Sequence, residues 1–280
     1  MLADMHAPNR PADAGATPIG ALLREWRAAR RLSQLDLALT AEISTRHLSC
    51  VETGKAQASR ETVARLADAL DMPLRERNAL LLAAGFAPMY AESQLDAPQL
   101  RAVQTALLAI LRQQEPFPAV VMNRHWDLVQ GNDAARRFFA LLLGEQVAAG
   151  LSNVVRLMFD PNGLRPRVEN WEVVAETLLQ RVHREAVGGV PDATTEALLT
   201  EVLAYPGVPQ HLRRLNLAAP SVPVIPICFR RGDRVFNYFS AVTTLGTPQD
   251  VTLQELRIEA FFPADAATEA HARALRDSVP

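Results

Sequence analysis

The chain has 280 residues, a formal net charge of −2 and 49% hydrophobic residues, so its length favours two domains and its composition can fill a core in each. No apolar run approaches the roughly 18 residues that span a bilayer, and residues 1–16 lack the charged and apolar segments of a secretion signal. We therefore expect a cytoplasmic protein with no membrane partner and with a disordered leader over residues 1–16.

Cysteine and histidine are too few and too dispersed to indicate a metal site. Cys50 and Cys228 fall in different expected domains, which argues against a disulfide and favours two small buried hydrophobic side chains. None of the six histidines has ligand-like spacing beside a carboxylate on one helix. We expect neither a metal nor another cofactor.

The first predicted element is a helix over residues 17–31. Thr17 is suited to cap it, and Pro18 is suited to its first turn. One face holds apolar residues at the spacings i, i+3, i+4 and i+7, namely Ile19, Leu22, Leu23 and Trp26. The opposite face holds four arginines, which favours DNA binding only weakly because such a face is usually just solvated.

Residues 33–54 have the pattern of two short helices joined by a tight turn. Ser33 and Asp36 form a capping box at the start of the first helix. Apolar residues fall on the inner faces of both helices, and Ala38 is small enough for a close crossing. Glu42 occupies the turn position that often holds glycine, and a positive φ there costs a non-glycine residue roughly 1 kcal/mol.

The outward face of the second helix of this pair carries short polar residues and one arginine, a geometry that places hydrogen-bonding side chains in a DNA major groove. Arg46 is best suited to guanine, because a bidentate bond to that base contributes about 1–3 kcal/mol of discrimination. Lys55, the only lysine, is suited to a phosphate, whereas Gln34 could contact DNA or simply cap its helix. The predicted DNA contacts are Gln34, Thr45, Arg46, His47, Ser49, Lys55 and Arg60.

Two further helices, over residues 59–70 and 73–85, complete an all-α five-helix domain over residues 17–87. The segment STRHLSCVETGKAQASRETVARLADALDMPLRERNALLLAAGFAP resembles the N-terminal domain of MmyB-like transcription regulators, a helix-turn-helix domain of the Cro and phage-repressor type. Gln57 and Ala58 replace the arginine and proline that relatives tend to carry, so we expect one phosphate contact fewer.

The residue pattern over 88–115 differs from that of the first domain and predicts a connector helix that begins near Asp96 and Pro98. Its apolar stripe consists of Leu100, Val103, Leu107, Ile110 and Leu111. We expect this helix to pack on the second domain or on the copy of that domain in a dimer.

Residues 116–268 predict an α+β domain with an antiparallel sheet. The sequence predicts two short strands over residues 119–122 and 126–130, followed by a helix from Asn132 or Asp133. This order resembles the beginning of a PAS-like sensor domain. A helical block, which includes residues 171–187, continues to residue 205. The remaining predicted elements are a hairpin over 222–229 and 235–245, a last strand over 256–262 and a C-terminal tail over 269–280.

This second domain also resembles the ligand-binding domain of the MmyB-like family. The matching segments are NRHWDLVQGNDAA, FDPNGLRPRVENWEVVA and FNYFSAVTTLGTPQDVTLQELRIEAFFPAD, so the resemblance covers about residues 18–275 in all. The resemblance implies a small, largely apolar ligand such as a fatty-acyl chain, whose carboxylate an arginine could bind.

The aromatic residues concentrated in this domain are candidates for the lining of a ligand pocket. The apolar candidates are Phe138, Phe139, Met158, Phe159, Trp171, Val174, Phe236, Tyr238 and Phe239, and the polar candidates are Asn132, Arg156, Asn170, Tyr238 and Thr243. Each apolar residue could equally belong to an ordinary core, and Asn132 and Asn170 could cap helices.

No pattern in the chain indicates catalysis. Beyond Lys55 no lysine exists to serve a Ser–Lys self-cleaving site, and G-x-S-x-G, P-loop and GxGxxG motifs are absent. We expect a homodimeric transcription regulator that binds a double-stranded DNA operator and is controlled by a small apolar ligand in the PAS-like domain. The alternative is a DNA-binding protein whose second domain dimerises or docks a protein without a ligand.

Overall fold

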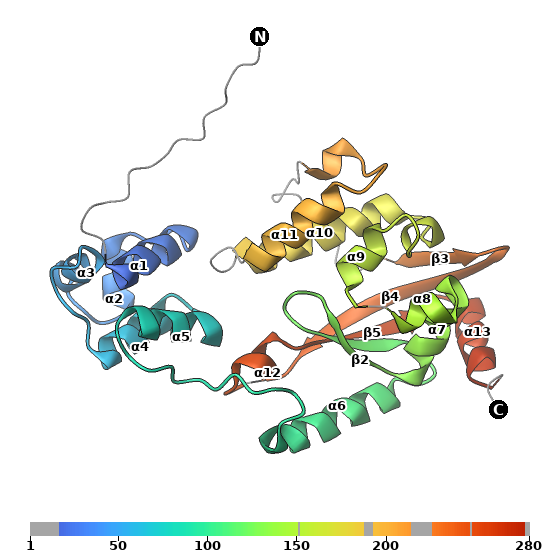
Figure 1. Cartoon of the computed structure of the whole chain (residues 1–280), viewed down its shortest axis with the longest axis horizontal. Coiled ribbons are helices and arrows are strands. Elements are labelled where there is room, and N and C mark those ends of the chain that lie inside the picture. The colour runs from blue at the N-terminus through green and yellow to red at the C-terminus, as the bar shows by residue number, and fades with distance from the viewer. Residues whose placement is uncertain (1–16, 151, 188–192, 214–225, 247, 278–280) are drawn as a thin grey trace, which may run out of the picture. The chain divides into compact units, whose positions relative to one another are not determined.

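The computed structural model in Figure 1 describes residues 17–150, 152–187, 193–213, 226–246 and 248–277. The chain divides into two compact units, of which the first ends at Tyr90 and the second begins at Ala91. This division lies close to the domain end expected at residue 87. The expected leader over residues 1–16 lies outside the described residues.

The first unit contains five helices within its described residues, in agreement with the predicted all-α bundle. Thr17, Ser33, Ser44 and Ser59 cap the first four, each through a side-chain oxygen that accepts from a backbone N–H of the first turn. The helices are α1 (Pro18–Ala29), α2 (Gln34–Thr40), α3 (Thr45–Glu52), α4 (Arg60–Ala69) and α5 (Leu74–Ala83).

A buried apolar core holds these helices together. Leu23, Leu37, Leu48 and Leu66 are completely buried, and Trp26 is 1% exposed. The expected turn between α2 and α3 is present, with a φ of 54° at Glu42. Because this is the left-handed region, the turn places a non-glycine residue where glycine is favoured.

Helices α1 and α3 approach each other closely at Gly20. A Cβ atom added to Gly20 would lie only 2.3 Å from the carbonyl oxygen of Glu52. The side chain of Glu52 is 1% exposed and receives Arg27 Nε at 2.9 Å and Arg27 Nη2 at 3.1 Å. The absence of a Cβ atom at Gly20 and the ion pair between Arg27 and Glu52 therefore fix the position of α3 on α1.

The described residues of the second unit form one five-stranded antiparallel sheet with the order β2-β1-β5-β4-β3. Its strands are β1 (Ala119–Met122), β2 (Leu128–Gly131), β3 (Ile227–Arg231), β4 (Arg234–Thr244) and β5 (Arg257–Pro263). This confirms the predicted antiparallel sheet. The part of the expected hairpin at 222–225 lies outside the described residues.

The second strand begins two residues later than predicted. Trp126 has a φ of 68°, and the side chain of Asn123 accepts from the backbone N–H groups of His125 and Asp127. These bonds extend the turn, so pairing with β1 starts only at Leu128.

Helices pack against both faces of the sheet (Figure 1). On one face, α6 (Arg101–Gln113), which follows a 3₁₀ turn over Pro98–Leu100, buries Leu107 and Leu111 against Val121 and Ile258. The other face packs in one core with α7 (Asp133–Leu143), α9 (Val154–Phe159), α10 (Trp171–Val187) and α11 (Ala193–Leu203). Short helices α8 (Glu145–Ala149) and α12 (Val251–Glu255) and 3₁₀ turns at Arg165–Arg167 and Gln210–Arg213 complete the connections.

The last helix, α13 (Ala266–Asp277), occupies most of the segment expected as a tail over 269–280. Thr268 is completely buried, and its hydroxyl accepts from the backbone N–H of Asn237 on β4. Ala272 is also buried, so α13 belongs to the folded domain.

The chain is anchored on both sides of the division between the units. The side-chain amide of Asn78 accepts from the backbone N–H of Tyr90 at 3.1 Å and donates to its carbonyl oxygen at 2.8 Å. The carbonyl oxygen of the next residue, Ala91, accepts from the backbone N–H of Val251 at 2.8 Å. The last anchored residue of the first unit is thus followed directly by an anchored residue of the second.

We expect Gly20→Ala to lower the free energy of unfolding of the first unit by about 1–3 kcal/mol, because its methyl group must push α3 away from α1. Chemical denaturation followed by circular dichroism measures the loss. Ala21→Ser, on the exposed side of the same helix, serves as the control and should change stability by less than about 0.5 kcal/mol. Equal stability of Gly20→Ala and the wild type would contradict the close approach.

Candidate functional site

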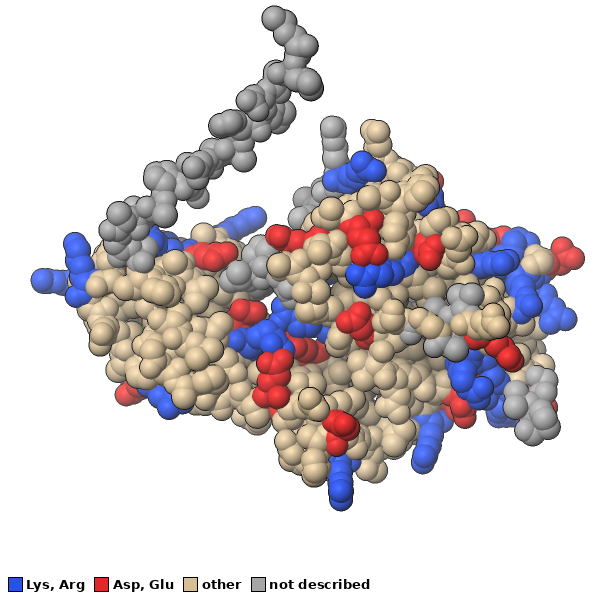
Figure 2. All heavy atoms as spheres, in the orientation of Figure 1, with Lys and Arg blue, Asp and Glu red and all other residues tan. Residues whose placement is uncertain are grey.

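The candidate DNA interface is the outward face of α3. Leu48 and Val51 point into the core, so the opposite face of this helix is directed away from it. Arg46 is exposed there, and Thr45, His47 and Ser49 are half-buried. At the left of Figure 2, basic side chains project from the unit where Figure 1 places α2 and α3.

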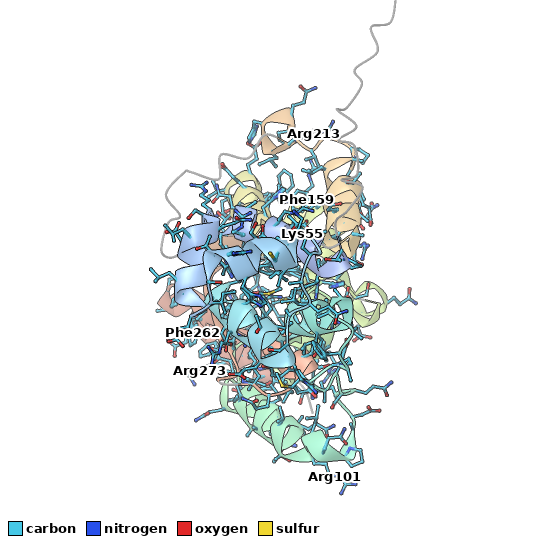
Figure 3. The ribbon with its side chains drawn as sticks, turned by 90° about the vertical axis from the view of Figure 1, so that its left-hand side faces the viewer. Lys55, Arg101, Phe159, Arg213, Phe262 and Arg273 are labelled. Carbon is cyan, nitrogen blue, oxygen red and sulfur yellow. The ribbon has the colours of Figure 1, made fainter. Side chains whose placement is uncertain are left out.

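The other predicted DNA contacts lie at the ends of neighbouring elements. Lys55, labelled in Figure 3, is exposed just after Gly54, where α3 has ended. Arg60 is exposed at the first position of α4, and its Nη2 donates to the carbonyl oxygen of Ala87 at 3.4 Å. The structure therefore places both basic groups near the surface, with Arg60 already engaged by the domain itself.

Gln34 is held in place by the ion pair that joins α1 and α3. Its Nε2 donates to Oε2 of Glu52 at 2.7 Å, beside the bond from Arg27. One N–H of this amide is thus used within the domain, and the capping function at the start of α2 belongs to Ser33. The carboxylate of Glu52 orients Gln34 at the start of its helix.

The second unit contains a cavity of about 240 Å³ between the sheet and α9 and α10. Its walls are mainly apolar, as is typical of small-molecule sites. The polar side chains in the lining are Thr177, Arg181, Ser240 and Glu259, and the apolar ones include Val120, Leu128, Phe139, Met158, Val174, Leu178 and Phe261.

Three of the predicted ligand contacts, Phe139, Met158 and Val174, line this cavity. Thr243 is an exposed residue of β4 that pairs with Ile258, on the face that packs against α6. Phe239, also on that face, stacks on Phe262 with the ring centroids 5.4 Å apart.

Most of the predicted aromatic residues pack beside the cavity. Phe138 lies edge-to-face with Phe229, Phe236 and Tyr238, with ring centroids 5.1, 5.7 and 5.2 Å away. Such edge-to-face contacts stabilise a core beyond the area that they bury. Trp171 donates from Nε1 to the carbonyl oxygen of Met158 at 2.7 Å and packs against Phe159.

The two asparagines among the candidates bind the protein backbone. Asn132 Oδ1 accepts from the N–H groups of Ala119 and Ala135, which caps α7 and joins it to β1. Asn170 Oδ1 accepts from the N–H of Cys228 at 3.0 Å, and its Nδ2 donates to the carbonyl oxygen of Pro226 at 2.6 Å. Both amides therefore connect distant segments of the fold.

Arg156 points away from the cavity and forms an ion pair with Glu201 of α11. Its Nε and Nη2 donate to the two carboxylate oxygens at 2.9 and 2.8 Å. These hydrogen bonds hold the pKa of Glu201 below its ordinary value. With its guanidinium bound in this way, Arg156 is poorly placed to receive the carboxylate of a ligand.

Arg181 and Glu259 are the charged cavity residues that sequence reasoning missed. Arg181 shares a face of α10 with Val174 and Leu178, and its guanidinium carbon lies 4.7 Å from the ring centroid of Trp126. Glu259 is 9% exposed and lies on the face of β5 opposite Ile258 and Ala260, whose alternation predicted the strand. The available signal was Arg181, at helical spacing from Val174 and Leu178, whereas the alternation in β5 gave no signal for Glu259.

Comparison with known families assigns both units. Residues 103–275 match the MmyB-like transcription regulator ligand binding domain, and residues 18–80 match a helix-turn-helix domain. The protein is a DNA-binding transcription regulator with a helix-turn-helix domain and a ligand-binding domain. More particularly, the chain belongs to the MmyB-like transcription regulator family.

Two solved structures are similar to parts of the chain. The restriction-modification controller protein C.AhdI from Aeromonas hydrophila is 36% identical over 22% of this chain and 92% of its own, with a TM-score of 0.21. An RNA-binding light-oxygen-voltage receptor is 14% identical over 93% of this chain and 62% of its own, with a TM-score of 0.24. A search of curated proteins found no match.

Two further properties concern only the part of the chain that the structure describes. Within it, no helix has the length and apolar character needed to cross a membrane. The same residues contain no group of three or more histidine, cysteine, aspartate or glutamate side chains placed to hold a metal ion.

Burial, reinforced by the negative charge of Asp265, raises the pKa of Tyr238 to about 12. An unfolded tyrosine ionises near pH 10, so the folded state retains this proton where the unfolded state loses it. The contribution of the protonated Tyr238 hydroxyl to the free energy of unfolding is therefore fully present below pH 10 and is lost as the pH rises towards 12. We expect a loss of about 1 kcal/mol by pH 11 in the wild type.

Tyr238→Phe should remove this part of the alkaline destabilisation. Urea unfolding at pH 9 and pH 11 measures the difference, and Tyr90→Phe, a residue of the other unit, serves as the control. An unchanged pH dependence in Tyr238→Phe would show that this hydroxyl is not protected by the core.

Proposed function

We propose that the protein is a one-component regulator in which α3 reads DNA base edges and a small apolar ligand in the cavity adjusts operator affinity. The observation that carries the ligand half of this proposal is the apolar cavity of about 240 Å³ inside the matched ligand-binding domain. The DNA half rests on the polar outward face of α3, with Arg46 exposed. We further propose a cytoplasmic protein without catalytic activity.

The proposed ligand has an apolar, fatty-acyl-like body. Phe139, Met158, Val174 and Leu178 supply the apolar wall that such a body needs. Arg181 replaces Arg156 as the proposed partner for a hydrogen-bond acceptor on the ligand, because its side chain lines the cavity.

The second domain is proposed to be PAS-like. Its antiparallel sheet has the order β2-β1-β5-β4-β3, with a helical block between β2 and β3, which supports this assignment. A homodimer is proposed because one recognition helix reads about one half-site, and two-fold operators pair two copies. In such a dimer, the ligand would change the relative placement of the two recognition helices. It can change operator affinity only by as much as its own affinity differs between the two placements.

A second candidate function for this domain is dimerisation or protein docking without a ligand. Leu108 and Ile110 on α6 are each 38% exposed, which is the observation that favours it. The two functions differ in whether the cavity is filled in the purified protein.

Arg46→Ala should weaken binding to operator fragments retained from genomic DNA by roughly 10- to 100-fold, because a bidentate base contact contributes about 1–3 kcal/mol. Fluorescence anisotropy at one fixed salt concentration measures the change. Arg101→Ala, which removes the same charge from an exposed site on α6, is the control. If both variants bind equally well, base recognition lies elsewhere than at Arg46.

Leu178→Trp should fill the cavity and expel a bound ligand, because its side chain lines the apolar wall. Native mass spectrometry of the purified proteins checks this: the wild type should carry a co-purifying small molecule that the variant lacks. Leu108→Trp, outside the cavity on α6, should retain it. A wild type that shows only the mass of the polypeptide would favour the docking function.

A further inference from the structure

A groove of about 290 Å³ adjoins the ligand cavity at the side of the sheet that ends with β2. Its lining comes mainly from β2 and α7, with Ala148 of α8. Three side chains, those of Val120, Leu128 and Phe139, line both this groove and the cavity of about 240 Å³. These three residues therefore form the wall between the two spaces.

Phe139 is the part of this wall that the sheet does not hold. Val120 is 4% exposed and belongs to β1, which pairs with β2 on one side and with β5 on the other. Leu128 belongs to β2 and is fixed by the same ladder. Phe139 projects from α7, is half-buried, and has its ring centroid 6.0 Å from that of Phe138. It is also the largest of the three side chains, so its truncation opens the wall most.

The cavity on its own is small for a ligand site. Small-molecule sites typically have volumes of about 300–1,000 Å³, whereas this cavity measures about 240 Å³. An apolar cavity of about 150 Å³ holds one benzene molecule. In proportion, the cavity beside Phe139 holds an apolar chain of about eight to ten carbon atoms. A longer chain needs further room, and the groove lies directly behind the ring.

The groove is suited to the continuation of an apolar chain. Val129, which is 40% exposed, lines it together with Ala135 and Ala148. Gln130 and Arg136 also belong to its lining. A chain that passed the wall would therefore meet apolar side chains first available to it there, beside polar groups that solvate its end.

We propose that Phe139 sets the length of the ligand: with its ring in place the cavity takes a medium-chain acyl group of about eight to ten carbon atoms, and without it a longer chain continues into the groove. This inference rests on the proposed function of the cavity as a ligand site. It names the chain-length class of the ligand, which the apolar character of the cavity alone leaves open.

Unbranched fatty acids from hexanoate to tetradecanoate test this limit, because all of them share one head group. Isothermal titration calorimetry with the full-length protein measures the affinity for each acid. Every methylene group that is buried against apolar side chains should raise the affinity about fourfold. In the wild type this rise should stop at about ten carbon atoms. The comparison requires no substitution.

Phe139→Ala should extend the rise beyond this limit, because the chain can then enter the groove. We expect the ratio of the affinities for tetradecanoate and octanoate to increase at least about tenfold over that of the wild type. Retained binding of octanoate shows that the variant is folded. Phe262→Ala is the matched control, since it removes another half-buried phenylalanine, one that stacks on Phe239 on the face packed against α6. This control should keep the limit of the wild type.

The outcomes separate this inference from the proposed function. A wild-type affinity that rises steadily up to tetradecanoate would overturn the length limit and leave the apolar-ligand function in place. The same limit in Phe139→Ala as in the wild type would overturn the role of Phe139. If the wild type bound none of the acids, both the apolar-ligand function and the length assignment would fail.

Discussion

The carboxylate of Glu52 is almost completely buried, and three hydrogen bonds from Arg27 and Gln34 hold it. Through these bonds, residues from α1, α2 and α3 share one charged centre. Breaking one partner of such a buried pair typically costs 3–5 kcal/mol, because the other charge is left unsatisfied. The orientation of α3, and with it the placement of Thr45, Arg46, His47 and Ser49, depends on this arrangement.

Glu259 presents the same chemical problem in the second domain, with a different outcome. Glu52 receives a two-point bond from an arginine of its own domain, whereas Glu259 receives one hydroxyl from Ser240. A buried charge that is held at two or more points fixes the relative orientation of the elements that contribute to it. The two glutamates thus differ in how firmly their own domains hold them.

Local chemistry explains why most of the fold could be predicted from the sequence. Ser33 and Ser59 begin helices because their hydroxyl groups satisfy nearby backbone donors, and such signals lie within a few residues of their targets. The start of β2 was misplaced because Asn123 binds the backbone of the turn, a contact that apolar alternation does not report. The end of the chain was expected to be a tail because its buried residues are small, as in α13.

The cavity was harder to predict because its lining comes from segments that are distant in the chain. Arg156 was a reasonable choice for a carboxylate partner, but Glu201, forty-five residues away, already binds it. Arg181 and Glu259 line the same cavity only because α10 packs over the face of β5 that Phe261 shares. Spacing within one helix or strand identifies a buried face, and it does not show which faces will enclose a space.

The junction at Tyr90 and Ala91 bears on how the proposed ligand signal would leave the second domain. Asn78 binds the backbone of Tyr90, and the backbone of Val251 binds that of Ala91, so two successive residues are held by different domains. A long flexible linker would absorb a small displacement as slack, since its entropy changes little with extension. A displacement of Val251, if ligand binding caused one, would therefore act on the chain one residue after the last residue that the side chain of Asn78 holds.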